Sequence, residues 1–129
     1  MTRRIVVALL LLCLACLGQT NPAGTYKGKW AGGAANGDFT VRLERAGDEW
    51  KATVQFTLGG ADVPTTMNML RVDGSTIEMK YDFDLGGNKL QSHLTGEIKE
   101  GQFSAKYKTK ALADDSAVDE GTCEAKRQE

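Results

Sequence analysis

The chain has 129 residues, enough for one domain, and its 16 Lys and Arg residues nearly balance its 17 Asp and Glu residues. With 41% hydrophobic and 26% charged residues, the composition excludes a disordered chain, a collagen-like chain and a protein with several membrane spans. The formal net charge of −1 lacks the basic excess that a general nucleic-acid binder needs, so we expect no nucleic-acid partner.

Residues 1–18 have the pattern of a secretory signal peptide. A short positive region with two arginines is followed by an apolar stretch over residues 5–17. A membrane-spanning helix needs about 20 apolar residues, so this stretch is too short to cross a bilayer. We therefore expect an exported protein, located in the periplasm or outside the cell, with a short linker over residues 19–24 and a folded domain over residues 25–129.

Two forms of the mature N-terminus remain open. Residues 14–16, Leu-Ala-Cys, resemble the end of a bacterial lipobox, in which Cys16 becomes the lipidated first residue and anchors the protein to a membrane. Cys13 stands where a lipobox usually has Leu. The alternative is ordinary cleavage after Ala15 or after Gly18, because small residues stand at the required offsets. That cleavage yields a secreted protein without a lipid anchor.

From Gly24 onward, apolar and polar residues alternate, which is the pattern of β-strands with one buried face. Turn-forming pairs, such as those at 73–74 and 86–87, interrupt the alternation at short intervals and favour tight hairpins. The alternation loses its phase between residues 64 and 72, which predicts a β-bulge there. Eight strands are expected in chain order, around residues 26–30, 39–43, 50–56, 64–72, 77–85, 90–98, 103–107 and 121–127.

These strands predict an all-β fold: a single antiparallel up-and-down meander of about eight strands that forms a closed or nearly closed barrel. Short connections favour antiparallel neighbours, because a parallel crossover needs roughly a dozen residues or more. A two-sheet β-sandwich is the alternative, and the barrel is preferred because closure removes exposed strand edges that invite aggregation. The connection over residues 112–120 is longer and polar, and we expect it to act as a lid at the rim. We expect a monomer.

The tripeptide Gly28-Lys29-Trp30 resembles the Gly-x-Trp signature that opens the lipocalin-like (calycin) barrels. The resemblance implies an eight-stranded barrel in which Trp30 closes one end and a basic residue of the last strand stacks on it. Arg127 has the matching inward parity, and such a stack contributes about 0.5 to 2 kcal/mol. The open end is then expected opposite Trp30 and Arg127. A bacterial periplasmic metalloprotease inhibitor is similar in its small barrel and its opening Gly-x-Trp, which gives a second analogy.

No combination of residues indicates catalysis or a metal site. His93 is the only histidine, and its parity places it on the outer face. Asp82 and Asp84 share that outward parity, which is typical of a solvated sheet face. Cys123 has the alternating neighbours of a buried wall residue, and a single thiol forms neither an internal disulfide nor a zinc site. We therefore expect a protein that is not an enzyme, with no cofactor and no metal.

The inward positions of the strands differ in size along the chain. Large apolar residues gather in the strands between residues 39 and 83, and smaller ones gather in the remaining strands. Large residues that face small ones either interdigitate into a filled core or leave a cavity, and the sequence leaves both outcomes open.

If a cavity forms, aromatic rings with polar tips and an adaptable methionine are the residues suited to line it. The predicted ligand-binding residues are Trp50, Phe56, Met79, Tyr81 and Tyr107. The resulting hypothesis is an exported, non-catalytic, lipocalin-like barrel that binds a small apolar or amphipathic ligand. The alternative is a protein-interaction module of the cell envelope, such as a periplasmic protease-inhibitor-like barrel.

Overall fold

The structure of the protein is a computed structural model that describes residues 21–128. The predicted signal peptide, with the lipidation candidate Cys16, lies outside the described residues. Between residues 21 and 128, no helix is long and apolar enough to span a bilayer. The described residues form nine strands: β1 (Gly24–Gly32), β2 (Asn36–Ala46), β3 (Glu49–Leu58), β4 (Ala61–Val63), β5 (Thr66–Asp73), β6 (Thr76–Leu85), β7 (Asn88–Lys99), β8 (Gln102–Ala111) and β9 (Ala117–Arg127).

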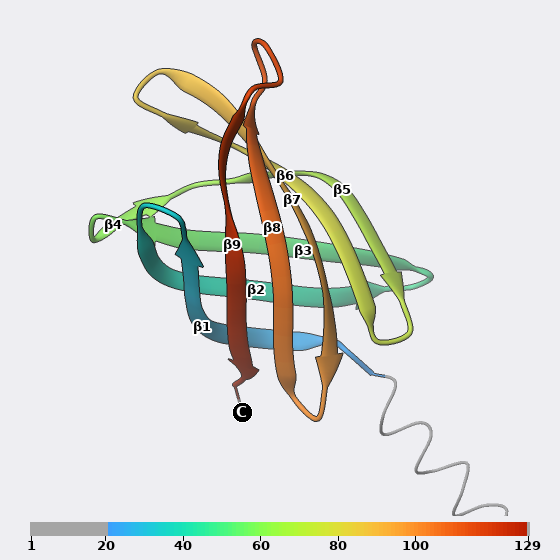
Figure 1. Cartoon of the computed structure of the whole chain (residues 1–129). Coiled ribbons are helices and arrows are strands. Elements are labelled where there is room, and N and C mark those ends of the chain that lie inside the picture. The colour runs from blue at the N-terminus through green and yellow to red at the C-terminus, as the bar shows by residue number, and fades with distance from the viewer. Residues whose placement is uncertain (1–20, 129) are drawn as a thin grey trace, which may run out of the picture.

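All nine strands belong to one antiparallel sheet, which curls into an open half-barrel (Figure 1). The strand order is β4-β3-β2-β1-β9-β8-β7-β6-β5, so the first and last strands lie side by side at the centre of the sheet. This order confirms the predicted antiparallel meander and the predicted pairing of the first strand with the last. A single sheet also excludes the two-sheet sandwich.

The two edges of the sheet, β4 with the first part of β3 (residues 49–55) on one side and β5 on the other, are not joined by a ladder of hydrogen bonds. We call the gap between β3 and β5 the seam. One side-chain hydrogen bond crosses the seam in the described structure: the Thr65 hydroxyl, just before β5, donates to the carbonyl oxygen of Val54 at 2.6 Å. The half-barrel therefore stays open at this line, where the prediction allowed full closure.

The sheet contains a predicted bulge, a strand that was not predicted, and a turn that is shorter than predicted. The pairing register of β5 with β6 shifts between Met67 and Met69, which confirms the predicted bulge. A short additional strand, β4, follows the turn after β3 and brings the strand count from eight to nine. The predicted lid over residues 112–120 is wrong in its length, because β9 already begins at Ala117 and pairs with β8 beyond a second register shift. The connection is only the short turn over residues 112–116.

The central pair, β1 and β9, depends on a glycine at position 28. A Cβ atom on Gly28 would lie 1.8 Å from the carbonyl oxygen of Glu124 and 2.6 Å from the Cα atom of Ala125. Both atoms belong to the β9 backbone, so only a residue without a side chain allows the two strands to approach this closely. This contact is the physical reason for the glycine in Gly28-Lys29-Trp30.

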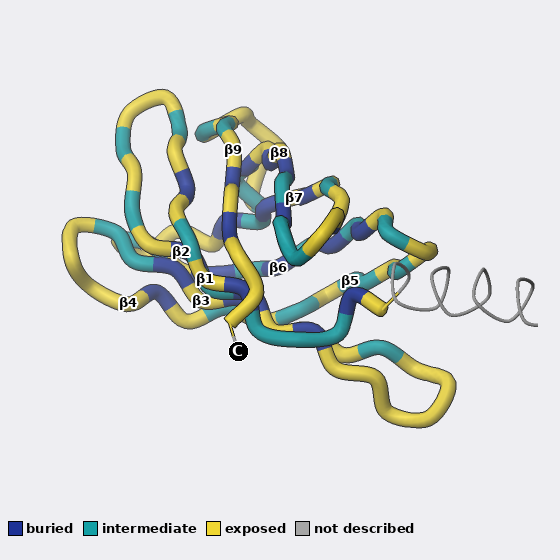
Figure 2. Tube along the Cα trace, turned by 90° about the horizontal axis from the view of Figure 1, so that it is seen from below, coloured by how far each residue is buried: buried dark blue, intermediate teal, exposed yellow. Residues whose placement is uncertain are grey.

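The core lies on the concave face of the half-barrel, where buried residues alternate with more exposed ones along the long strands (Figure 2). In β2, for example, Phe39, Val41 and Leu43 are fully buried and the residues between them are not. The rings of Phe39 and Tyr26 both contact Phe103, each with ring centroids 6.0 Å apart. Burial on one face with a period of two is what the alternating sequence predicts.

Candidate functional site

One end of the half-barrel contains an apolar cavity of about 220 Å³. This end is formed by the turn between β1 and β2, the hairpin of β8 and β9, and the adjoining ends of β3, β6 and β7. The rim includes Val118, a large apolar side chain that is 50% exposed, so the cavity reaches the solvent there. The residues that line the cavity are Trp30, Ala34, Ala35, Phe39, Phe56, Leu58, Tyr81, Phe83, Leu85, Leu90, Ser92, Tyr107, Thr109, Val118, Asp119 and Cys123.

Aromatic rings from five different strands form the apolar walls. Trp30 of β1 lies edge-on to Phe56 of β3, with ring centroids 5.9 Å apart, and edge-on to Tyr107 of β8 at 6.3 Å. Phe56 in turn lies edge-on to Phe83 of β6 at 5.0 Å. The indole Nε1 of Trp30 donates to the carbonyl oxygen of Thr57 at 2.8 Å, which fixes the orientation of the ring. The wall is therefore a set of interlocked rings with defined positions.

A row of polar side chains crosses the opposite wall. Tyr81 is paired with Ser92, Ser92 with Thr109, and Thr109 with Asp119, across the four neighbouring strands β6, β7, β8 and β9. The hydroxyl oxygens of Ser92 and Thr109 lie 2.6 Å apart and share a hydrogen bond. We call these four residues the polar row. Because directly paired residues point to the same face of a sheet, the row lies along one line of the cavity.

The carboxylate of Asp119 connects the polar row to the β1–β2 turn. Its Oδ1 accepts a hydrogen bond from the backbone N–H of Gly33 at 2.9 Å, and its Oδ2 accepts one from the Tyr107 hydroxyl at 2.8 Å. A Cβ atom on Gly32 would lie 2.2 Å from Asp119 Oδ2 and 2.5 Å from the Tyr107 hydroxyl oxygen, so the glycine leaves room for this contact. Asp119 thereby holds the rim together on one side.

The two phenols and the thiol that line the cavity are kept in their protonated forms. Burial raises the pKa of Tyr81 well above its ordinary value. Burial and the hydrogen bond to Asp119 raise the pKa of Tyr107 in the same direction. Burial raises the pKa of the Cys123 thiol to about 12. At neutral pH the two phenols and the thiol are therefore uncharged, and the thiol lacks the thiolate character that a nucleophile needs.

The cavity contains three of the five predicted ligand-binding residues. Phe56, Tyr81 and Tyr107 line it. Met79 is fully buried in the core and does not line the cavity. Trp50, at the beginning of β3, is only half-buried and lies under the guanidinium of Arg45, 5.4 Å from the ring centre. Parity placed both residues on the inward face correctly, but they lie at other levels of the half-barrel than the cavity.

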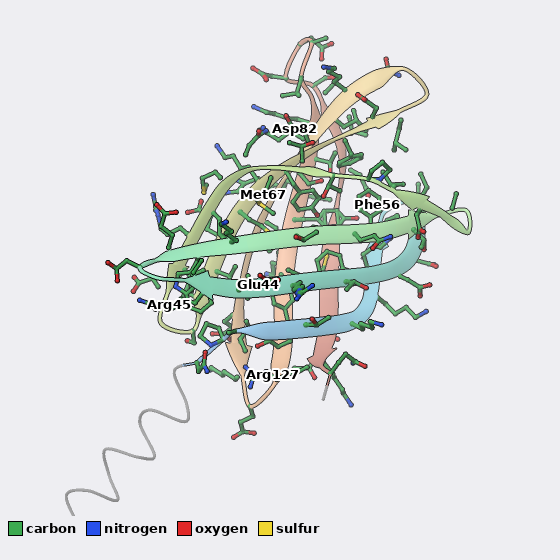
Figure 3. All side chains as sticks on the ribbon, turned by 180° about the vertical axis from the view of Figure 1, so that it is seen from behind. Glu44, Arg45, Phe56, Met67, Asp82 and Arg127 are labelled. Atoms are coloured by element: carbon green, nitrogen blue, oxygen red, sulfur yellow. The ribbon has the colours of Figure 1, made fainter. Side chains whose placement is uncertain are left out.

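The expected stack of Arg127 on Trp30 does not form. In the register of β1 with β9, Trp30 faces Cys123, and Arg127 faces Tyr26. The guanidinium of Arg127 stacks on the Tyr26 ring at 5.4 Å. Figure 3 shows Arg127 at the end of β9, away from Phe56 on the cavity wall. The cavity lies at the Trp30 end, away from Arg127, and Trp30 lines it, so the expected open end opposite a joint Trp30 and Arg127 plug is wrong.

Sequence reasoning did not assign Trp30, Ser92, Thr109 and Asp119 to the ligand site, although a signal was present for two of them. Ser92 and Thr109 are hydroxyl residues at inward positions of adjacent strands, where an apolar residue is the usual choice. Asp119 carried no such signal, because it lay in the expected polar loop.

The outer face of the sheet carries a second hollow with a more polar lining, formed by His93, Thr95, Lys106, Tyr107, Lys108, Glu120, Gly121 and Thr122. His93 lies outside, as expected, with Nε2 2.7 Å from Glu78 Oε2, and this hydrogen bond lowers the pKa of Glu78. Asp82 accepts a hydrogen bond from the Gln91 side chain at 2.9 Å. In the part of the chain that the structure describes, no group of three or more His, Cys, Asp or Glu residues is placed to hold a metal ion.

No family model, no curated protein and no solved structure matches the chain. The class of protein is therefore defined by the fold and the cavity alone: an all-β antiparallel half-barrel with an apolar cavity at one end. This architecture is compatible with a lipocalin-like barrel.

Proposed function

We propose that this is an exported, non-catalytic, lipocalin-like protein that binds a small apolar or amphipathic ligand in the cavity beside Trp30. The observation that carries the proposal is the cavity itself, which combines aromatic walls, a few polar groups on one side and an opening to solvent. This combination is typical of small-molecule sites. The interlocked rings also support the proposal, because they form the walls without a ligand present.

The volume limits the size of the ligand. An apolar cavity of about 150 Å³ holds a benzene-sized molecule. The cavity of about 220 Å³ in this protein therefore suits a single ring with a short substituent. A long acyl chain exceeds this volume and would need to extend past Val118 into solvent.

The chemistry of the lining favours binding over catalysis. The phenols and the thiol that face the cavity are held protonated by burial, so none of them is ready to act as a base or a nucleophile at neutral pH. The one carboxylate, Asp119, accepts hydrogen bonds from Gly33 and Tyr107, which fix its position at the rim. These groups are arranged to orient a ligand.

Tryptophan fluorescence tests the proposal, because the chain has only two tryptophans and one of them lines the cavity. In a Trp50→Phe variant, Trp30 is the remaining indole, and titration with ethylbenzene should give a saturable change in its emission. In the matched Trp30→Phe variant, the distant Trp50 should not respond. If Trp30 shows no saturable change and calorimetry detects no heat of binding, the proposal fails and a protein-interaction role in the cell envelope becomes the leading hypothesis.

A further inference from the structure

The polar row and Asp119 define which ligands the cavity accepts. The row lies along the wall formed by β6 to β9, among apolar residues such as Phe83 and Leu90, while Trp30, Phe39 and Phe56 of β1 to β3 add only aromatic rings to the lining. The polar groups that a ligand can reach are therefore gathered on one side of the cavity. This asymmetry is already set by the strand register, which places the row's four side chains on adjacent strands.

The charge of the cavity lining is negative. Asp119 is the one carboxylate among the lining residues, and no Lys, Arg or His lines the cavity in the described part of the chain. None of the ion pairs formed between residues 21 and 128 involves Asp119. Among residues 21–128, no cationic side chain forms an ion pair with this carboxylate.

The hydrogen-bonding capacity of Asp119 is only partly used. An ionised carboxylate offers about four lone-pair sites and no donor. Gly33 and Tyr107 occupy one site on each oxygen. The remaining sites can bind only a ligand group that donates a hydrogen bond. The neighbouring hydroxyls of Ser92 and Thr109 donate and accept, so they place no such restriction on the ligand.

We propose that the ligand is a compact ring compound with an amino or hydroxyl donor, cationic or uncharged, which directs that donor to Asp119, and that the cavity rejects carboxylates. This inference rests on the proposed function. A cationic donor gains a charge-assisted hydrogen bond in a partly dry site. An anionic group would be stripped of water beside an unneutralised carboxylate, and nothing in the lining would compensate that loss.

The inference is tested with the mature protein purified from cells. Three matched probes, 2-phenylethylamine, 2-phenylethanol and phenylacetate, carry different polar groups, and ethylbenzene tests the apolar cavity alone. Dissociation constants are measured by calorimetry at neutral pH. We expect the amine to bind most tightly, the alcohol next, and phenylacetate at least about tenfold more weakly than the amine. The Asp119 carboxylate attracts the ammonium group and repels the carboxylate of phenylacetate.

Two variants assign the preference to Asp119. Asp119→Asn removes the charge at nearly constant shape, and it should reduce the ratio of amine to phenylacetate affinity by about tenfold. Glu120→Gln removes the same charge at the next residue, which is exposed on the outer face, and it should leave that ratio unchanged. Circular dichroism confirms that each variant keeps its strands. If Asp119→Asn does not fold, the order of the probes on the unmodified protein still decides.

The outcomes separate this inference from the proposed function. Binding of ethylbenzene together with equal or tighter binding of phenylacetate overturns the ligand class and leaves the binding function standing. The same ratio in Asp119→Asn and in the unmodified protein overturns the role of Asp119. Failure of all four probes overturns both proposals. The expected order, lost in Asp119→Asn and kept in Glu120→Gln, supports both.

Discussion

The guanidinium of Arg127 lies 5.4 Å from the centre of the Tyr26 ring, although 101 residues separate the two in the sequence. Its Nη2 donates to the Tyr26 hydroxyl at 2.7 Å and to the carbonyl oxygen of Asn21 at 2.7 Å. The Tyr26 hydroxyl in turn donates to the carbonyl oxygen of Pro22 at 2.7 Å. This cluster joins β1, β9 and the residues before β1 at the end of the half-barrel that lies away from the cavity.

Arg127→Ala should lower the free energy of unfolding by about 1 to 3 kcal/mol, because a cation–π contact and hydrogen bonds from a charged donor are lost together. Lys126→Ala is the matched control. Its side chain lies exposed on the other face of β9, so its effect should stay within about 0.5 kcal/mol. Urea unfolding measures both, and equal losses would contradict the special role of Arg127.

Gly28→Ala should destabilise the protein by about 2 to 3 kcal/mol or more, because the new Cβ overlaps the β9 backbone and forces the two central strands apart. Gly33→Ala provides the comparison. A Cβ at position 33 meets only Asp119 Oδ1, at an ordinary 3.5 Å, and the N–H that Asp119 binds remains. We expect thermal unfolding to show a clear loss for Gly28→Ala and little change for Gly33→Ala.

Trp30→Ala should cost about 3 to 5 kcal/mol of stability, since a buried indole and its packing against Phe56 and Tyr107 are removed. Trp50→Ala should cost clearly less, because Trp50 is only half-buried and touches the rim of the core. Guanidinium unfolding of the two variants gives the comparison. A near-zero change for Trp30→Ala would mean that the ring does not belong to the core.

The buried thiol of Cys123 predicts a loss of stability at high pH. Its pKa is raised to about 12 in the folded protein, against an ordinary value of 9.0. Between these two values the unfolded chain has released the proton and the folded chain has not. The free energy of unfolding therefore falls by up to about 1.4 kcal/mol per pH unit as the pH rises from 9 toward 12. Below pH 9 the thiol is protonated in both the folded and the unfolded chain, so the full stability is retained.

Urea unfolding at pH 8 and pH 10 measures this loss, and Cys123→Ala should show a smaller fall between the two. Cys13 and Cys16 are also present in the full sequence, so both are replaced by Ser in the reference protein and in the Cys123→Ala variant. An identical fall in both proteins would contradict the assignment to Cys123.

Mass spectrometry of the protein from its native cells tests the predicted export. We expect cleavage between Ala15 and Gln19. A diacylglyceryl mass on Cys16 would select the lipoprotein alternative, and an unmodified N-terminus after Ala15 or Gly18 would select ordinary cleavage. An intact Met1 on the mature species would exclude both.

The sequence predicts which face a residue occupies more readily than the level at which it lies. Alternation places Phe56, Met79 and Trp50 on the inward face, because burial on one side of a strand repeats every second residue. It says nothing about depth along the strand, so Phe56 reaches the cavity and the other two do not. Depth depends on register between strands, which turn chemistry sets only for adjacent hairpins.

The partner of Arg127 shows the same limit over a longer distance. Tyr26 and Trp30 both have inward parity, so alternation alone allows Arg127 to stack on either ring. Only the register of β1 with β9 selects Tyr26. The polar residues around Asp119 predict a loop at this position. The structure places it in β9, because the pairing with β8 continues past a register shift that the residue pattern does not predict.

The position of β9 between β1 and β8 has a consequence for how the protein is made. Among the nine strands described, β9, which completes the centre of the sheet, is synthesised last. Without β9, β4-β3-β2-β1 and β8-β7-β6-β5 are two four-stranded parts with no strand pairing between them, each with a free central edge. Strand pairs so distant in sequence form slowly, because chain entropy is lost before their contacts stabilise the fold. A nascent chain that lacks the 11 residues of β9 therefore remains open and accessible to chaperones or proteases.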